Sequence, residues 1–245
     1  SVWRLDNPPG VAISAVDDYT QWKRALGNDS TSDLATFTVR DGFQIERLRS
    51  ATPQEGSWIA LEFDPQGRLI IAREDRGLLR FTLSAGNGAS LMVESIEDSL
   101  KECRGLLYAA DSLFVNANES KALFRMRDLD GSGRYQKPRL LYRTSGSTGH
   151  GRNNLALGPD GKIYSIHGDA VDLPAAARNH LSPFREHSRG QSTREGHLLR
   201  TDADGGGWEL LAAGLRNPFG IDFNADGEAF TYDADAEHDM GAPWY

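Results

Sequence analysis

Short runs of apolar residues separated by polar turns recur along most of the chain. Three segments share one plan: an apolar strand end leads into a polar turn closed by Gly, and a second apolar strand follows. These segments are Phe63–Leu69, Leu157–Ile163 and Phe223–Ala229, and a degenerate fourth copy is Leu107–Leu113. The pattern predicts repeated β-hairpins.

The spacing of the copies indicates the architecture. Taking Gly67, Ser112, Gly161 and Gly227 as equivalent points gives separations of 45, 49 and 66 residues. The first two separations match the roughly 40 to 50 residues of a four-stranded propeller blade, and the third is lengthened by an insertion. We therefore expect an all-β fold, a β-propeller of four-stranded blades with about four blades, as an incomplete portion of a longer propeller.

The remaining organisation follows from local composition. Residues 1–36 form an N-terminal extension in which the spacing of apolar residues over 14–27 predicts a short helix, begun by Asp17 or Asp18. The propeller is expected over residues 37–245. Within it, the polar stretch at about 170–195 is expected to be a surface insertion.

Composition and charge exclude several classes of protein. Of the 245 residues, 39% are hydrophobic and 25% are charged, and the longest apolar runs are far too short to span a membrane. A net charge of −8 argues against nucleic acid as a partner. The single cysteine, Cys103, excludes an intrachain disulfide, a zinc ribbon and CxxC chemistry, and there is no CxxCH site for haem attachment.

One candidate catalytic residue is His150, which stands between two glycines directly before a predicted strand. The glycines allow the backbone to approach a ligand closely, and loops at strand entrances face the mouth of a propeller. His150 is therefore a candidate general base. The alternative is a histidine that only hydrogen-bonds within a turn.

Two Arg-Asn pairs occupy equivalent places in the third and fourth copies. Because equivalent positions of a propeller point to one axial region, we expect them to converge on one site. Guanidinium groups bind carboxylates and quinone-type oxygens through charge-assisted bonds, so this site suits an anionic ligand. The alternative is that each Arg pairs with an Asp of a neighbouring blade. The candidate cofactor-binding residues are Arg152, Asn153, Arg216 and Asn217.

Two acidic stretches are candidate cation sites. In the first, four carboxylates alternate along an extended segment, which favours calcium unless the segment is simply a solvated acidic edge. The second, Asp128–Gly133, copies the first half of a calcium loop, but its twelfth position is Arg139 instead of Glu. The candidate metal ligands are Asp233, Asp235, Glu237, Asp239, Asp128 and Asp130.

The order of these motifs resembles that of the soluble glucose/sorbosone dehydrogenases, which are six-bladed propellers that use pyrroloquinoline quinone and calcium. The residues that carry the resemblance are His150–Arg152, Gly158–Tyr164, Gly196–Arg200 and Arg216–Gly220. The stretches Asn224–Glu228, Phe230–Glu237 and Gly241–Tyr245 resemble more narrowly the membrane-bound, sorbosone dehydrogenase-like proteins of planctomycete-type bacteria, which often carry a c-type haem domain.

The resemblance implies a role for each matched residue. His150 would be the base that takes the substrate hydroxyl proton while hydride passes to the quinone. Arg152 would lie near the cofactor, and Arg216 and Asn217 would contact it. The stretch Asp233–Asp239 corresponds to the calcium-binding region of the family, although it lacks the family's Gly-Pro loop.

The resemblance also implies partners and a location. The substrate would be a small sugar or alcohol, the electron acceptor a c-type cytochrome domain outside this chain, and the location periplasmic or otherwise exported. Two other functions stay open, because propellers host unrelated activities. One is a catalytically silent propeller that binds carbohydrate or a protein, and the other is a calcium-dependent, lactonase-like hydrolase.

Overall fold

The computed structural model describes residues 37–84, 91–174 and 195–234. Contacts divide the chain into two units, Ser1–Ser50 and Ala51–Tyr245. The described part of the first unit is irregular apart from one turn. The helix expected over 14–27 lies outside the described residues, as does most of the expected insertion.

Within the described residues every strand belongs to the second unit, and these strands form three four-stranded antiparallel sheets and one two-stranded sheet. Blade 1 contains β1 (Trp58–Phe63), β2 (Leu69–Arg73), β3 (Arg76–Leu83) and β4 (Leu91–Lys101). Blade 2 contains β5 (Cys103–Ala109), β6 (Ser112–Ala117), β7 (Ala122–Arg127) and β8 (Arg139–Arg143). Blade 3 contains β9 (Arg152–Leu157), β10 (Ile163–His167), β11 (Gly196–Thr201) and β12 (Glu209–Leu215). The last sheet pairs β13 (Ile221–Phe223) with β14 (Ala229–Thr231).

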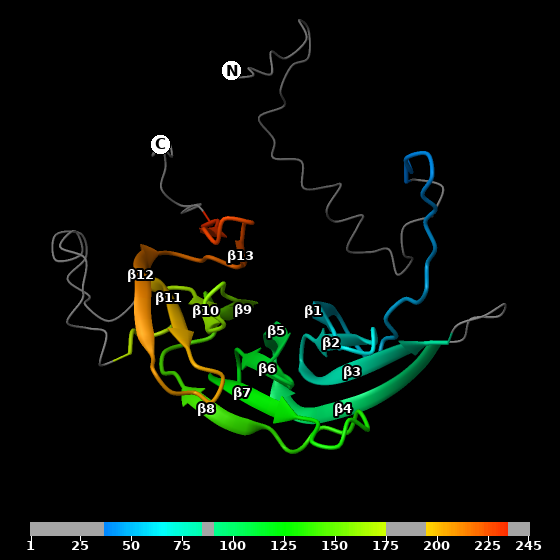
Figure 1. Ribbon diagram of the computed structural model, residues 1–245, viewed down its shortest axis with the longest axis horizontal. Coiled ribbons are helices and arrows are strands. Elements are labelled where there is room, and N and C mark those ends of the chain that lie inside the picture. The colour runs from blue at the N-terminus through cyan, green and yellow to red at the C-terminus, as the bar shows by residue number, and fades with distance from the viewer. Residues whose placement is uncertain (1–36, 85–90, 175–194, 235–245) are drawn as a thin grey trace, which may run out of the picture. The chain divides into compact units, whose positions relative to one another are not determined.

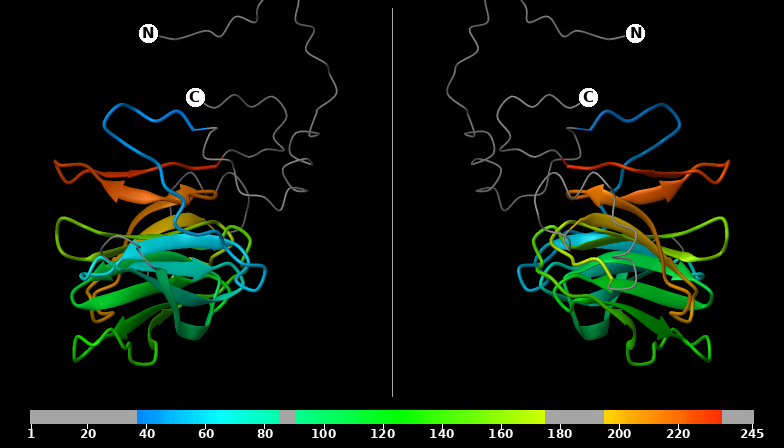
Figure 2. Two further views of the ribbon diagram at one scale, coloured as in Figure 1. Left: turned by 90° about the vertical axis from the view of Figure 1, so that its right-hand side faces the viewer. Right: turned by 90° about the vertical axis from the view of Figure 1, so that its left-hand side faces the viewer.

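The blades are arranged as in a propeller. Each sheet pairs its strands in chain order, and the first strand of each blade contacts the first strand of the next. Figure 1 shows β1, β5 and β9 on the inner side of this unit and β4, β8 and β12 on its outer side, and Figure 2 shows the same sheets from the side. The all-β partial propeller expected from the repeats is therefore confirmed. The described residues contain no helix, so none of them forms a helix that could cross a membrane.

The turns that revealed the repeat join the first two strands of each blade. Three of them are five-residue loops whose fourth residue is Gly67, Gly161 or Gly227, with φ between 73° and 80°. This left-handed conformation favours glycine, which explains why the residue recurs. In the degenerate copy Ala109 pairs with Ser112, so only Ala110 and Asp111 form the turn, and both have positive φ.

The core lies between the blades, because each blade buries both faces of its sheet. Every residue of β6 is buried, and successive side chains point to opposite faces. Leu113 and Val115 pack in the cluster shared with blade 1, whereas Phe114 packs with Leu155 and Ile163 of blade 3.

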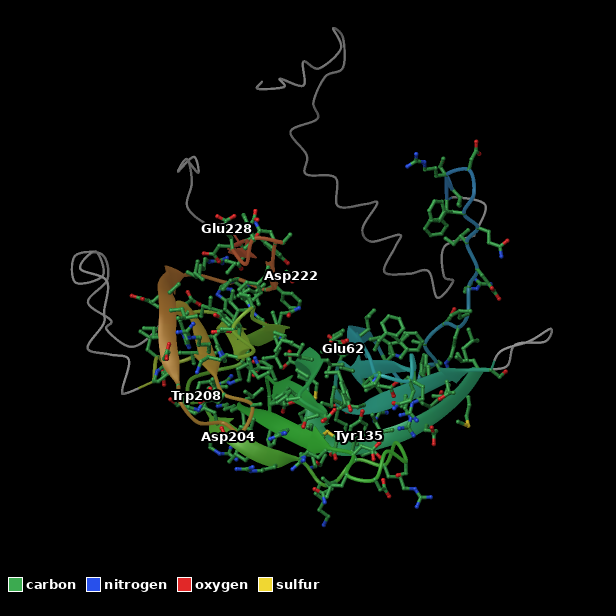
Figure 3. All side chains as sticks on the ribbon, in the orientation of Figure 1. Glu62, Tyr135, Asp204, Trp208, Asp222 and Glu228 are labelled. Carbon is green, nitrogen blue, oxygen red and sulfur yellow. The ribbon has the colours of Figure 1, made fainter. Side chains whose placement is uncertain are left out.

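A similar interface follows blade 3, where the rings of Tyr164 and Phe223 meet edge to face with their centroids 4.8 Å apart. Between blades 2 and 3, Trp208, which is labelled in Figure 3, packs against the outer strand β8. Its ring lies against that of Tyr142, with 4.3 Å between centroids. Aromatic contacts of this kind add to the area that the interface buries. Alternate side chains of one sheet thus pack against the blade before it and the blade after it, and these contacts hold the blades together.

This packing predicts that Phe114→Ala lowers the free energy of unfolding by about 3 to 5 kcal/mol, because it opens a cavity between two blades. The matched control is Leu129→Ala, whose side chain is 61% exposed and which should change stability by less than about 0.5 kcal/mol. Urea unfolding of the full-length protein measures both. Equal, small losses in the two variants would contradict the interface.

Candidate functional site

Three loops meet at one end of the sheets: residues 144–151 before β9, 168–174 after β10, and 216–220 before β13. Backbone hydrogen bonds join them. The Ala170 amide donates to the His150 carbonyl at 3.1 Å, and the Asp169 amide donates to the Arg216 carbonyl at 2.7 Å. We call this end of the sheets the site face. The structure thus brings together His150 and Arg216, which lie in the entrance loops of successive blades.

The central pair of the site face is His150 and Asp169. His150 Nδ1 lies 2.8 Å from Asp169 Oδ1, and each side chain is about one third exposed, at 32% and 33%. A neutral imidazole that donates its Nδ1–H to this carboxylate keeps Nε2 as a proton acceptor. The pair therefore has the arrangement of a base whose tautomer is fixed by a neighbouring acid.

The glycines near His150 have different structural roles. A Cβ at Gly151 would lie 1.9 Å from Asn118 Oδ1, and a Cβ at Gly168 would lie 2.7 Å from His150 atoms, whereas a Cβ at Gly149 would meet nothing within 4 Å. Gly151 and Gly168 thus permit close packing of protein against protein. Only Gly149 leaves open space beside the histidine.

Arg152 is completely buried at the start of β9. Its guanidinium donates to the carbonyls of Ser145 and Ser147, at 2.8 and 2.9 Å, and also to Thr144 Oγ1. A further bond reaches the Asn118 carbonyl at 3.3 Å. Burial lowers the pKa of Arg152 to about 10. The Arg152 side chain, which we expected to lie near a cofactor, thus lies inside the protein, where it binds the backbone of the His150 loop.

Asn153 is also buried and joins the same loops. Its Nδ2 donates to the Pro218 carbonyl at 2.6 Å. In the loop before β13, the amides of Arg216 and Asn217 donate to the two carboxylate oxygens of Asp233, each at 2.7 Å. Asp233 thus holds the second Arg-Asn pair at the site face, and Arg216 itself is half-buried there.

The candidate cation ligands lie in two separate places. Asp128 accepts the Gly133 amide and Asp130 accepts the Ser132 amide, which shapes the turn between β7 and β8 at the end of blade 2 away from the site face. Asp235, Glu237 and Asp239 lie outside the described residues. Among the residues that are described, no three His, Cys, Asp or Glu side chains gather into a group that could hold a metal.

A buried polar row supports the loop that carries Asp169. His167 Nε2 lies 2.8 Å from Ser165 Oγ, and the His167 ring stacks on that of His197 with 4.8 Å between centroids. Ser165 in turn accepts a bond from Asn116 of blade 2. Burial, with the nearby His197 and Arg152, holds the pKa of His167 well below 6.5. His167 is therefore neutral in the folded protein at neutral pH.

Sequence reasoning missed four residues of the site face, namely Asp169, Asn118, Glu102 and Arg104. Asp169 is the second residue after the strand of the third copy, and its place behind Gly168 at a strand end was the available signal. Arg104 lies on β5 and Asn118 follows β6, and both meet the His150 loop only through the packing of the blades. Glu102, directly before β5, bonds these two side chains.

Comparison with protein families identifies the sequence group. The model of the domain of unknown function DUF7133 matches residues 86–242, which is more than half of the chain. The chain belongs to the DUF7133 family. A comparison with curated proteins finds no match.

Solved structures with similar folds include sugar dehydrogenases. The PQQ domain of pyranose dehydrogenase from Coprinopsis cinerea is 12% identical with a TM-score of 0.52, and 71% of this chain aligns with 42% of that one. An oxidoreductase (glucose dehydrogenase) from Thermus thermophilus is 20% identical with a TM-score of 0.50, covering 72% of this chain and 56% of that one. A further glucose dehydrogenase is 18% identical with a TM-score of 0.51, covering 73% and 62%.

At these identities the likeness concerns the fold. This DUF7133 chain spans less than two thirds of each of the three solved structures. Its three blades and its β13–β14 pair therefore correspond to part of a propeller of the kind that those dehydrogenases contain.

The buried polar row predicts that acid destabilises the protein. Below pH 6.5 an unfolded histidine binds a proton that folded His167 does not, so stability falls by about 1.4 kcal/mol per pH unit between 6.5 and the lowered folded pKa. Urea unfolding at pH 7.5 and 5.5 should show this loss in the wild type and a smaller one in His167→Gln. The same loss in both proteins would contradict the assignment.

Proposed function

We propose that this DUF7133 propeller contributes the active site of a dehydrogenase that oxidises a sugar or alcohol hydroxyl, with a pyrroloquinoline quinone-type cofactor and calcium. The observation that carries the proposal is the His150–Asp169 pair on the face that it shares with Arg216. For such an oxidation the pair would supply the base, and the hydride would pass to a separate acceptor, which is the part proposed for the quinone.

The donor set of the site face fits an anionic quinone. The Arg216 backbone accepts the Asp169 amide and donates to Asp233, and its half-buried guanidinium donates to the Ala234 carbonyl at 3.4 Å. A guanidinium in such a place can donate paired bonds to carboxylate or quinone oxygens. We assign Arg216 and Asn217 to cofactor binding, and we assign Arg152 and Asn153 to holding the loops that present them.

The chain's own residues would move one proton. His150 Nε2 would accept the proton of the substrate hydroxyl, and the Asp169 carboxylate would stabilise the imidazolium through Nδ1–H. When bound, the quinone would supply the two-electron acceptor for the hydride that leaves the carbinol carbon. Arg216 would hold anionic oxygens of the bound molecule, and its positive charge would stabilise the negative charge that develops on them.

The described carboxylates do not form a calcium site by themselves. Both oxygens of Asp233 accept backbone amides, and the Asp128–Asp130 turn lies at the other end of blade 2. The calcium part of the proposal therefore rests on Asp235, Glu237 and Asp239, with Asp233 as their neighbour. No step of the mechanism above depends on the ion.

The resemblance to exported and membrane-bound dehydrogenases supports two further parts of the proposal. The protein would act in the periplasm or outside the cell, and a c-type cytochrome domain outside this chain would accept the electrons. Neither part is needed for the proton transfer at His150.

The test uses the full-length protein loaded with pyrroloquinoline quinone and calcium and assayed with sugars and alcohols and an artificial electron acceptor. The bound quinone should be visible by its absorbance. His150→Ala should lower kcat by roughly 10² to 10⁴, because a general base contributes that much. Asp169→Asn should lower kcat by a smaller factor. This variant keeps His150, but the amide no longer fixes the tautomer of its imidazole.

Lys137→Ala is the control, because Lys137 is exposed on the segment that leads into β8, away from the site face. It should keep wild-type turnover. Wild-type turnover in His150→Ala would remove His150 as the base. A wild type that never retains the quinone would overturn the dehydrogenase proposal in favour of a silent, ligand-binding propeller.

A further inference from the structure

The loop that carries His150 accepts hydrogen bonds from blade 2 as well as from blade 3. Arg104 of β5 donates to the Gly149 carbonyl at 3.2 Å and to the Thr148 carbonyl at 3.5 Å. Asn118, which follows β6, donates to the same Thr148 carbonyl at 2.9 Å. Two side chains of one blade therefore hold the two residues directly before the histidine of the next.

Glu102 joins these two side chains. Glu102 Oε1 accepts hydrogen bonds from two nitrogens of Arg104, from Nε at 2.8 Å and from Nη2. Glu102 Oε2 accepts a hydrogen bond from Asn118 Nδ2 at 2.7 Å. The Glu102 and Arg104 side chains are each only 21% exposed, so solvent screens their attraction less than that of a fully exposed pair. We call Glu102, Arg104 and Asn118 the blade-2 clamp.

The backbone of the clamp is itself fixed. Glu102 has φ of 51°, a left-handed conformation that a residue with a side chain seldom adopts. Its amide donates to the Asp75 carbonyl at 3.0 Å, and its carbonyl accepts the Asn118 amide at 2.9 Å. An unusual backbone conformation that is held in place by several hydrogen bonds often marks a functional position.

The two blades act on opposite sides of His150. Blade 3 holds the imidazole through Asp169 and the carbonyl through the Ala170 amide. Blade 2 holds the backbone just before it through the clamp. Hydrogen bonds from two blades thus hold the chain on both sides of His150.

We propose that the blade-2 clamp is a positioning element for the reaction at His150, with Arg104 as its central residue. This inference rests on the proposed function, because it concerns the placement of the proposed base. The clamp residues bond the loop backbone and each other, so they act through His150. A displacement of about 1 Å at a reacting group costs on the order of 10²-fold in rate, so loosening the loop should lower turnover more than substrate binding.

The experiment compares Arg104→Ala and Arg104→Lys with the control Arg200→Ala in the full-length protein loaded with quinone and calcium. Arg200 is ion-paired and of similar exposure, 28%, but it bonds Asp160 and Glu209 away from the site face. Arg104→Ala should lower kcat about tenfold or more and change KM less than about twofold. Arg104→Lys should have a kcat between those of Arg104→Ala and the wild type, because Lys keeps the charge but loses the planar guanidinium. The control should match the wild type.

A second readout does not require turnover. With 15N-labelled histidine, the Nδ1–H signal of His150, identified by its loss in His150→Gln, should be sharp in the wild type and in Arg200→Ala. It should be broadened or lost in Arg104→Ala. If the wild type has no dehydrogenase activity, the proposed function fails, and the clamp is still tested by this signal.

The outcome that overturns the clamp is a His150 Nδ1–H signal and a kcat in Arg104→Ala that equal those of Arg200→Ala. Circular dichroism establishes that each variant is folded. Should Arg104→Ala fail to fold, Glu102→Gln takes its place, because it keeps the shape of the side chain and removes the charge that orients Arg104. An unchanged signal in Glu102→Gln would likewise overturn the proposal.

Discussion

The arrangement of the site face depends on one buried charge, the guanidinium of Arg152. A charged group inside a protein is costly unless its donors are bonded, so the loop around it is forced to present carbonyl oxygens to it. The carbonyls of Ser145 and Ser147 come from the loop before β9, and the Asn118 carbonyl comes from blade 2. The path of the chain into His150 is thereby fixed from within.

The repeat of blades then supplies the rest of the site. Each blade buries both sheet faces, so neighbouring blades pack closely and their entrance loops meet. Asp169, from the loop after β10, reaches both His150 and the Arg216 backbone. A base, its orienting acid and a cationic side chain are brought to one face by three loops that are distant in the sequence.

Much of the fold could be predicted from the sequence, because it is encoded locally. Gly67, Gly161 and Gly227 mark equivalent turns, since each turn needs a left-handed residue at one place. The site was predicted only in part. Repeat equivalence placed His150 and Arg216 on one face, but the burial of Arg152 and the partnership of His150 with Asp169 arise from packing between loops. The spacing of residues cannot show which of two nearby polar groups points inward.

We propose that the His150–Asp169 pair and Arg216 form one binding face for an anionic quinone and its substrate. An experimental structure of the full-length protein with bound pyrroloquinoline quinone tests it most directly. We expect electron density for the quinone on the site face, within hydrogen-bonding reach of Arg216 and with His150 Nε2 facing the bound molecule. Density for the quinone at any other surface, with this face empty, would contradict it.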